Sequence, residues 1–342
     1  MSSELPTRPL GRNGPPIPAL GFGLMGLSAF YGSPASDEER FKLLDRVLEL
    51  GCIHWDTAQL YGDSEELLSK WFQRTGKRNE VFLATKFGNH VAPDGGRGIR
   101  NEPEYIRQAV AQSLQRLQAD HIDLLYCHRF SGKTPVEDIV STMKEFVDSG
   151  KVRYLGLSEC GPDTLRRACK IHPIHAYQIE YSPFSMDIER PETRLLATCR
   201  ELGIATVAYS PLGRGMLTGR YQSVDDFDEK DFRRSIPRFS KENFPRNLEL
   251  VRTLQTIADR KGCTSGQLVL AWMMAQGEDI FPIPGTKRIE YLEENMGAYA
   301  VALTAEENQQ IRDSIGHAEV HGTRVAERLM GDLVKDTPPL GD

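Results

Sequence analysis

The sequence lacks the features that direct a chain into or across a membrane. Its first residues, MSSELPTRPLGRNG, contain no apolar segment of the kind found in secretory signals, and no apolar run approaches the roughly 18 residues of a membrane span. Paired cysteines are missing as well, so we expect a cytoplasmic protein with no zinc site, no disulfide scaffold and no membrane contact. The six scattered cysteines, which form no CxxC pair, are Cys52, Cys127, Cys160, Cys169, Cys199 and Cys263.

An excess of positive charge is also absent. Lys and Arg number 42 against 48 Asp and Glu, which gives a formal net charge of −6. Such a surface repels phosphate backbones, so nucleic acid is not an expected partner, and any anion site must be a local cluster of basic residues. Hydrophobic residues at 39% and charged residues at 26% are the proportions of an ordinary globular protein.

The sequence does contain a regular alternation of short apolar runs and segments of helical period. Alternating strands and helices require a parallel sheet, which either closes into a barrel or stays open and doubly wound. Eight repeating units favour an α/β fold of the (β/α)8 TIM-barrel type. The predicted strands comprise residues 21–26, 52–57, 81–87, 122–128, 152–158, 176–182, 204–210 and 279–285. The predicted helices comprise residues 37–50, 65–74, 103–117, 136–148, 163–170, 192–202, 246–261, 265–276, 289–300 and 304–316.

The chain shows no linker or break in composition, so we expect a single domain over residues 1–342 with a core at about 10–316. The stretches LGRNG and PIPAL near the start suit a short N-terminal hairpin that caps the barrel floor. Long loops are expected at the C-terminal face, where the 211–245 insertion is too long for an idle connector. The tail beyond residue 316 is rich in Gly and Pro and is expected to fray.

Polar residues at strand ends are the candidates for catalysis, because active sites of such barrels lie at the C-terminal ends of the strands. Asp56 closes the second predicted strand, Lys86 the third and His128 the fourth, while Tyr61 follows Asp56 in the next loop. Taken singly, each has an ordinary structural explanation, such as a buried ion pair or a core histidine. Four together at adjacent strand ends favour an active site.

These four side chains meet the needs of carbonyl reduction by a nicotinamide. The hydride goes to carbon, and the protein must supply a proton and stabilise the developing alkoxide. Tyr61 can be the acid, although a free phenol has a pKa of about 10, and a neighbouring cation such as Lys86 would lower it. Asp56 can hold Lys86 in place, and His128 can orient the substrate oxygen.

A second motif points elsewhere and is set aside. Gly21, Gly23 and Gly26 in GFGLMG match G-x-G-x-x-G, the dinucleotide fingerprint of Rossmann folds. That fingerprint must open a helix, whereas LSAFYGSPAS after it is predicted to be a loop. The glycines more plausibly let the first strand pass close to a ligand.

Seven stretches resemble, in order, the motif series of the aldo-keto reductases. They are DTAQLYGDSEELL, LATKFG, IDLLYCHR, LGLSEC, YQIEYSPF, AYSPLGRGMLTG and PIPGTKRIEYLEENMGA. The resemblance covers residues 10–315 and is closest to the pyridoxal reductase-like and perakine reductase-like branch, on the strength of GLSEC, SPLGRGMLTG and PGTKRIEYLEEN.

The resemblance implies a monomeric NADP-dependent oxidoreductase that reduces an aldehyde or ketone to an alcohol and has no Rossmann domain. By position, Asp56, Tyr61, Lys86 and His128 fall on the catalytic tetrad, with Tyr61 as the proton donor. Contacts to NADP(H) fall, from the nicotinamide carboxamide and ring through the pyrophosphate and 2′-phosphate to the adenine, on Ser158, Gln178, Tyr209, Ser210, Leu212, Gly213, Arg214, Gly219, Gly285, Thr286, Lys287, Glu294 and Asn295. The residues of PGTKR agree, because a hydroxyl, Lys287 and Arg288 at a helix N-terminus favour a phosphate.

The sequence departs from the family pattern at two positions. Many members have Asn after the serine of the fifth strand, where this chain has Glu159, and this puts the nicotinamide contacts in doubt. The loop after Tyr61 reads YGDSE where YGxNE is common, and Ser64 is expected to cap the next helix instead.

Other functions and the substrate stay open at this level. The same fold serves NADPH-binding regulatory subunits, such as the β subunits of potassium channels, and barrel lyases or isomerases would bind no nicotinamide. The small carbonyl substrate is not identified: pyridoxal, aryl aldehydes and sugar-derived aldehydes are all candidates. Its predicted pocket residues are Phe30, Tyr31, Phe87, Phe130 and the loop after Tyr181.

Overall fold

The computed structural model describes residues 5–92, 95–229 and 231–341. Eight parallel strands form one sheet, in the spatial order β12 (Ile280–Pro282), β11 (Ala205–Tyr209), β10 (Ala176–Glu180), β9 (Val152–Ser158), β8 (Ile122–Cys127), β5 (Phe82–Phe87), β4 (His54–Asp56) and β3 (Phe22–Gly23). The amides of Gly21 and Gly23 donate to the carbonyls of Pro282 and Pro284 at 2.9 and 3.1 Å. These bonds join the first strand to the last, so the sheet closes and the predicted (β/α)8 barrel is confirmed.

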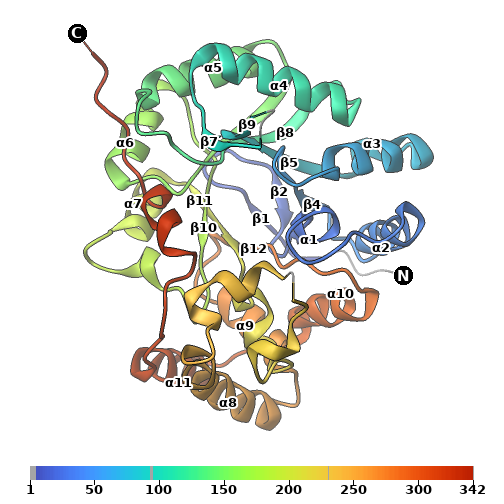
Figure 1. Cartoon of the computed structure of the whole chain (residues 1–342), viewed down its shortest axis with the longest axis vertical. Coiled ribbons are helices and arrows are strands. Elements are labelled where there is room, and N and C mark those ends of the chain that lie inside the picture. The colour runs from blue at the N-terminus through green and yellow to red at the C-terminus, as the bar shows by residue number, and fades with distance from the viewer. Residues whose placement is uncertain (1–4, 93–94, 230, 342) are drawn as a thin grey trace.

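The helices lie around the outside of the barrel (Figure 1). They are α1 (Met25–Ser28), α2 (Asp37–Glu49), α3 (Ser64–Thr75), α4 (Pro103–Leu117), α5 (Val136–Asp148), α6 (Pro162–Ile171), α7 (Leu195–Leu202), α8 (Asn243–Lys261), α9 (Ser265–Met274), α10 (Ile289–Met296) and α11 (Ala305–His317). The bounds of α4 and α5 agree with their predicted ranges. The predicted helix 289–300 divides into α10 and the 3-10 helix η7 (Gly297–Ala300), and the others end within three residues of prediction.

Apolar side chains fill both faces of the sheet, as expected for parallel strands covered on the outside by helices. Every residue of β5 and β8 is buried, and alternate side chains point to opposite faces. One cluster, which includes Leu83, Leu125 and Leu155, packs against the helices. A second fills the barrel interior and includes Leu124, Val207 and Phe281.

The predicted N-terminal hairpin is present. Strands β1 (Thr7–Pro9) and β2 (Pro16–Pro18) pair antiparallel, and Leu10 and Ile17 join the interior cluster. The hairpin thereby closes the floor of the barrel, opposite the strand ends that carry the candidate catalytic residues.

The loops at the strand C-termini hold more structure than the sequence indicated. A second hairpin, β6 (Asn89–Val91) with β7 (Arg97–Ile99), follows β5. The four-residue α1 occupies the end of the predicted first strand and the start of the predicted loop after it, because β3 ends already at Gly23. Four 3-10 helices, η3 (Gly213–Thr218), η4 (Val224–Asp226), η5 (Phe232–Ser235) and η6 (Pro237–Phe239), order the long insertion after β11. Three others are η1 (Arg78–Glu80), η2 (Asp187–Glu189) and η8 (Glu327–Asp332).

The tail after α11 differs from the frayed end that was expected. This C-terminal segment, residues 318–341, returns across the face that carries the strand C-termini and passes beside α6 (Figure 1). The side chains of Arg324 and Thr337 are buried, and the hydroxyl of Thr164 accepts a hydrogen bond from the amide of Thr337 at 3.0 Å. Arg167 donates to the carbonyls of Thr337 and Pro338. These buried polar contacts hold the segment on the barrel although its composition resembles a free tail.

Candidate active site

The four candidate catalytic residues lie together at the C-terminal end of the barrel. Asp56 ends β4, Lys86 lies in β5, and His128 directly follows β8. Lys86 Nζ donates to Asp56 Oδ1 at 2.5 Å and to the carbonyl of Thr57 at 2.8 Å, and it lies 3.4 Å from the hydroxyl of Tyr61. The rings of Tyr61 and His128 stand perpendicular, with centroids 6.0 Å apart.

Asp56 and Lys86 form an ion pair in the interior, exposed by 2% and 1% respectively. Burial acts against the charge of Lys86, but Asp56 and the oxygen of Tyr61 outweigh it and raise the pKa of Lys86. Asp56 also accepts a hydrogen bond from Gln178 Nε2 at 2.8 Å, so both of its carboxylate oxygens are satisfied. A cation is therefore fixed beside the phenol of Tyr61.

His128 is kept neutral by its surroundings. Burial, together with the charges of Arg129 and Lys86, holds the pKa of His128 well below its ordinary 6.5. A neutral imidazole has one N–H to donate and one nitrogen to accept. His128 can therefore donate a hydrogen bond to a substrate oxygen without competing with Tyr61 as the acid.

The loop that carries Tyr61 is held by α2. Arg40 of α2 donates two hydrogen bonds to the carboxylate of Asp63, at 2.8 and 2.9 Å, and a third to the hydroxyl of Ser28 at 3.1 Å. Gly62, between Tyr61 and Asp63 in the sequence, has φ +57°. A Cβ at this position would lie 2.6 Å from the carbonyl oxygen of Ser28. The loop thus needs glycine at this turn and a buried arginine behind it.

Ser64 does not have its expected role in this loop. It is the first residue of α3 and not its cap, and its hydroxyl accepts a hydrogen bond from Thr57 at 2.7 Å. Asp63 occupies the capping position, but its side chain bonds Arg40 and makes no cap bond. The ion pair to α2 has replaced the cap.

A cavity of about 540 Å³ opens over the four residues. Asp56, Tyr61 and His128 line it, while Lys86 lies behind them. The predicted cofactor residues that line the same cavity are Gln178, Tyr209, Ser210, Leu212, Arg214, Gly285, Thr286, Lys287 and Asn295. The structure therefore brings the two predicted sets together around one space.

Four predicted cofactor residues lie behind the lining. Ser158 is buried, and its hydroxyl lies 3.2 Å from Arg129 Nη1, which donates to it. Gly213 packs near Phe184, and Gly219 follows η3 with φ +74°. Glu294 is paired with Arg220 and accepts a hydrogen bond from the hydroxyl of Thr264. Their contacts with a cofactor remain predictions.

Two of the predicted substrate-pocket aromatics were assigned wrongly. Phe30 and Tyr31 line the cavity, but Phe87 and Phe130 are buried in the cluster between barrel and helices. Phe87 follows Lys86 in β5, so strand alternation turns its ring outward when Lys86 points inward. The far walls come instead from Met25, Leu60, Asn89, Ile99, Val325, Leu329 and Leu333.

Several basic side chains belong to the lining of the cavity. Lys287 and Arg288 precede α10 and line the space together with Arg214, Arg220 and Arg233. Arg220 lies 3.9 Å from the ring centroid of Tyr291, within the range of a cation–π contact. A local cluster of basic residues is the arrangement expected from the sequence for any anion site in a chain of net charge −6.

Motif matching did not single out Arg129, Arg220, Arg233 or Tyr291 as members of this lining. Arg129 adjoins His128 in the sequence, and its guanidinium lies 6.0 Å from the ring centroid of Tyr209. Its position directly after a predicted strand-end residue was a usable signal. Arg233 lies in the 3-10 helix η5, which is too short for the hydrophobic period of its sequence to indicate which way the side chain points.

The described residues show neither a candidate metal centre nor a candidate membrane span. Residues 5–92, 95–229 and 231–341 contain no cluster of three or more His, Cys, Asp or Glu side chains arranged to hold a metal ion. Within the same ranges, every helix is too short or too polar to cross a membrane.

Residues 19–315 match the model of the aldo/keto reductase family. The chain is 51% identical over 340 residues to "Aldo-keto reductase yakc [NADP(+)]" of Schizosaccharomyces pombe, and 52% identical over 341 residues to "Aldo-keto reductase str7" of Strobilurus tenacellus. Each alignment covers 98% of this chain and 99% of the relative.

Solved structures agree with the fold. The thermostable aldo-keto reductase Tm1743 superposes with a TM-score of 0.72 at 31% identity, covering 90% of this chain and 99% of that one. The glycerol dehydrogenase AKR11B4 of Gluconobacter oxydans gives a TM-score of 0.83 at 24% identity, covering 93% and 97%, a likeness that supports the fold alone.

Proposed function

The chain belongs to the aldo/keto reductase family, and from this premise we propose that it reduces an aldehyde or ketone to an alcohol with NADPH, with Tyr61 donating the proton. The observation that carries the proposal is the contact between Lys86 and Tyr61 at the base of a cavity that also holds a basic cluster. The fungal relatives and the motifs GLSEC and SPLGRGMLTG support the pyridoxal reductase-like branch. The six unpaired thiols fit the reducing conditions of the cytoplasm.

The lining of the cavity fits NADP(H). Tyr209 and Gln178 both line the cavity, and we assign to Tyr209 the stacking of the nicotinamide ring and to Gln178 a contact with its carboxamide. The loop 210–219 with Arg214 would follow the pyrophosphate. Lys287 and Arg288 would hold the 2′-phosphate at the N-terminus of α10, which favours NADPH over NADH.

The residues of the chain then divide the remaining work. Bound NADPH supplies the hydride that goes to the carbonyl carbon. Tyr61 gives its phenolic proton to the carbonyl oxygen, and Lys86 stabilises the phenolate that remains. His128, being neutral, donates a hydrogen bond to the same oxygen and orients the carbonyl. Asp56 keeps Lys86 charged and in position.

The test is NADPH oxidation with 4-nitrobenzaldehyde by the wild type and by Tyr61→Phe. We expect the variant to lose at least about 100-fold in kcat, because general-acid catalysis contributes a factor of that order. Its NADPH affinity, followed by fluorescence, should be unchanged. Tyr154→Phe, which removes a phenol near the barrel floor, is the matched control and should keep full activity.

Two other outcomes would point elsewhere. NADPH binding without turnover of any aldehyde or ketone tried would favour a nucleotide-sensing protein that acts through a partner. Absence of NADPH binding would contradict the proposal and favour a barrel enzyme of another chemistry.

A further inference from the structure

Glu159, which stands where many family members have asparagine, is buried completely and is ionised. It has φ +53°, a left-handed conformation that is costly outside glycine and is found where the surrounding contacts impose it. Burial opposes its ionisation, but the charge and hydrogen bonds of Arg324 outweigh burial and lower the pKa of Glu159 to about 2. The group that contributes most to keeping this carboxylate ionised, Arg324, comes from the far end of the sequence.

Arg324 meets Glu159 in a two-pronged ion pair. Its Nη1 and Nη2 donate to the two carboxylate oxygens of Glu159, each at 2.8 Å, and the side chain of Arg324 is 7% exposed. Such paired bonds fix the guanidinium in position and in plane. Arg324 lies on the C-terminal segment, so the pair ties that segment to the end of β9.

The same pair holds the ring that faces the cavity. The hydroxyl of Tyr209 donates to Glu159 Oε1 at 2.8 Å and accepts from Arg324 Nη1 at 3.1 Å. Tyr209 ends β11 and lines the cavity. Both hydrogen-bonding directions of the phenol are thereby used by the ion pair, which leaves the face of the ring for a ligand.

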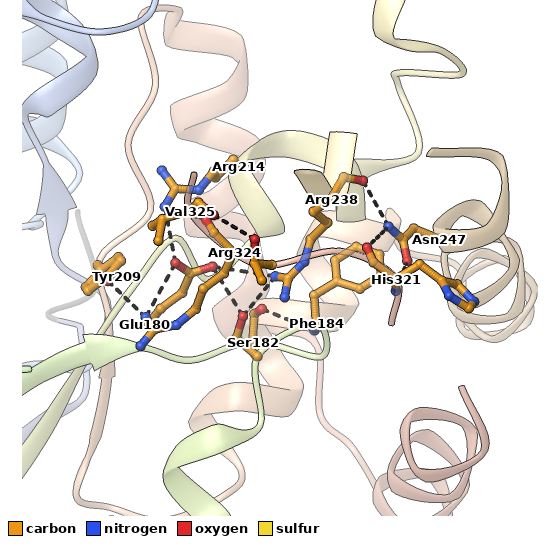
Figure 2. A network of polar contacts seen from close by, with 12 residues as sticks. Glu180, Ser182, Phe184, Tyr209, Arg214, Arg238, Asn247, His321, Arg324 and Val325 are labelled. Carbon is orange, nitrogen blue, oxygen red and sulfur yellow. Dashed lines mark hydrogen bonds and ion pairs between the residues drawn. The ribbon is translucent and has the colours of Figure 1, made fainter. Parts of the chain in front are cut away.

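Neighbouring contacts extend the connection along the segment. Arg324 also lies 3.7 Å from Glu180, which Arg214 contacts at 3.2 Å (Figure 2). The amide of Lys335 donates to the carbonyl of Glu159 at 3.1 Å. Between these two anchors, the segment places Val325, Leu329 and Leu333 in the wall of the cavity.

We propose that Glu159 and Arg324 are positioning residues: their ion pair fixes the ring of Tyr209 for the nicotinamide and holds the C-terminal segment over that half of the cavity. Glu159 thus acts on the nicotinamide through Tyr209, while the carboxamide is left to Gln178 and to Arg129, which lines the cavity beside Ser158. The inference rests on the proposed function, because it requires that the nicotinamide end of NADPH lies against Tyr209.

Comparison of two ligands tests this inference. NADPH reaches both ends of the cavity, whereas 2′,5′-ADP carries only the adenine and 2′-phosphate end. Arg324→Ala should weaken NADPH binding about tenfold and leave 2′,5′-ADP binding within about twofold, since truncating one partner of a buried charge pair has large local effects. Arg324→Lys keeps the charge and should recover part of the NADPH affinity.

Tyr209→Phe separates positioning from stability. It removes the tethered hydroxyl and keeps the ring, so we expect a smaller loss of NADPH affinity than in Arg324→Ala. In the Tyr209→Phe background, Glu159→Gln should then add less to that loss than it does in the wild type. Independent effects of the two substitutions would overturn the connection through the hydroxyl.

The chain contains a matched control. Arg312 on α11 makes a similar two-pronged pair with Glu189, at 2.9 and 3.1 Å, and Glu189 also accepts a hydrogen bond from the hydroxyl of Tyr181. None of these three lines the cavity. Arg312→Ala should lower the melting temperature without changing the ratio of the two affinities.

The outcomes separate the inference from the function on which it rests. If Arg324→Ala weakens both ligands equally, or neither, positioning is wrong while the reductase proposal stands. A wild type that binds neither ligand overturns both. Melting curves of each variant establish that the protein compared is folded.

Discussion

Lys86 is a charge kept in the interior by its neighbours. Its nitrogen is bound by Asp56 and by the carbonyl of Thr57, and the side chain has no access to water. Removing one member of a buried pair costs more than removing both, because a single unpaired charge is left without solvent.

Lys86→Met is therefore expected to lower the free energy of unfolding by about 3–5 kcal/mol and to abolish reduction. The double variant Asp56→Asn with Lys86→Met should regain much of the stability and none of the activity. Urea unfolding of the wild type and the variants measures this. Additive losses in the double variant would show that the two charges do not depend on each other.

At the residue scale, the sequence was sufficient to predict some members of the candidate site and not others. Asp56, Lys86 and His128 could be picked out because strand periodicity identifies the last polar residue of each strand. Glu159 could be noticed as a departure, but its partner could not, because Arg324 is 165 positions away and no local pattern links them. The prediction was wrong for Phe87 because a position at a strand end does not determine which face a side chain occupies, and Phe87 alternates with the inward-facing Lys86.

At the scale of elements, α2 supports the catalytic loop from behind. Arg40 is 6% exposed and connects three points of the chain: α2 itself, the end of α1 and the Tyr61 loop through Asp63. Asp37 on α2 contacts Arg40 as well. Helix α2 is therefore expected to affect catalysis without touching the cavity.

Arg40→Met should lower kcat for aldehyde reduction several-fold with little change in NADPH affinity, because the Tyr61 loop loses its support. Stability should fall by about 1–3 kcal/mol, the usual cost of leaving buried hydrogen-bonding groups unsatisfied. Arg46→Met on the same helix removes a half-exposed ion pair with Glu293 and should leave stability almost unchanged, because water and salt screen exposed ion pairs. Equal effects of the two substitutions on kcat would contradict the role given to Arg40.

Elements were predictable where local signals are strong. Helix α4 begins at Pro103, a residue favoured in the first turn of a helix, and α5 ends just before Ser149 and Gly150, a glycine with φ +71°. For both helices the apolar period agrees with these boundary signals. The C-terminal segment lacks such signals. The sequence of the β6–β7 hairpin contains the turn signal PDGG, but the stretches NHV and RGI beside it lack the apolar alternation that predicts strands. The segment is ordered by contacts to residues near 136, 159 and 164, which become neighbours only after the barrel has formed.

At the scale of the whole molecule, buried ionisable groups set the response to acid. His54 lies inside the barrel at 0% exposure, and neither ring nitrogen has a hydrogen-bond partner among the described residues. Burial lowers the pKa of His54 from 6.5 to about 4, and the charge of Lys86 acts in the same direction, although Asp56 opposes it. Because the unfolded chain takes up this proton more readily, stability falls as the pH drops from 6.5 towards 4.

Glu159 affects stability over a lower range of pH than His54. Its pKa falls from 4.5 in the unfolded chain to about 2 in the folded protein, so its contribution is complete above pH 4.5 and is lost as the pH falls towards 2. Between pH 6.5 and 4.5, the loss of stability therefore comes from buried histidines, with His54 joined by His128, whose pKa is also lowered.

The His54→Met variant tests this separation. Removing the buried imidazole should flatten the decline in unfolding free energy between pH 6.5 and 4.5, and the benefit should reach about 3 kcal/mol near pH 4, from the pKa difference of His54. His317→Gln, at an exposed position on α11, should follow the wild-type curve. Glu159→Gln should change the slope only below pH 4.5. Denaturant unfolding at a series of pH values measures all three. A His54→Met curve parallel to the wild type would show that the pKa of His54 is the same in the folded and unfolded states, and would contradict the prediction.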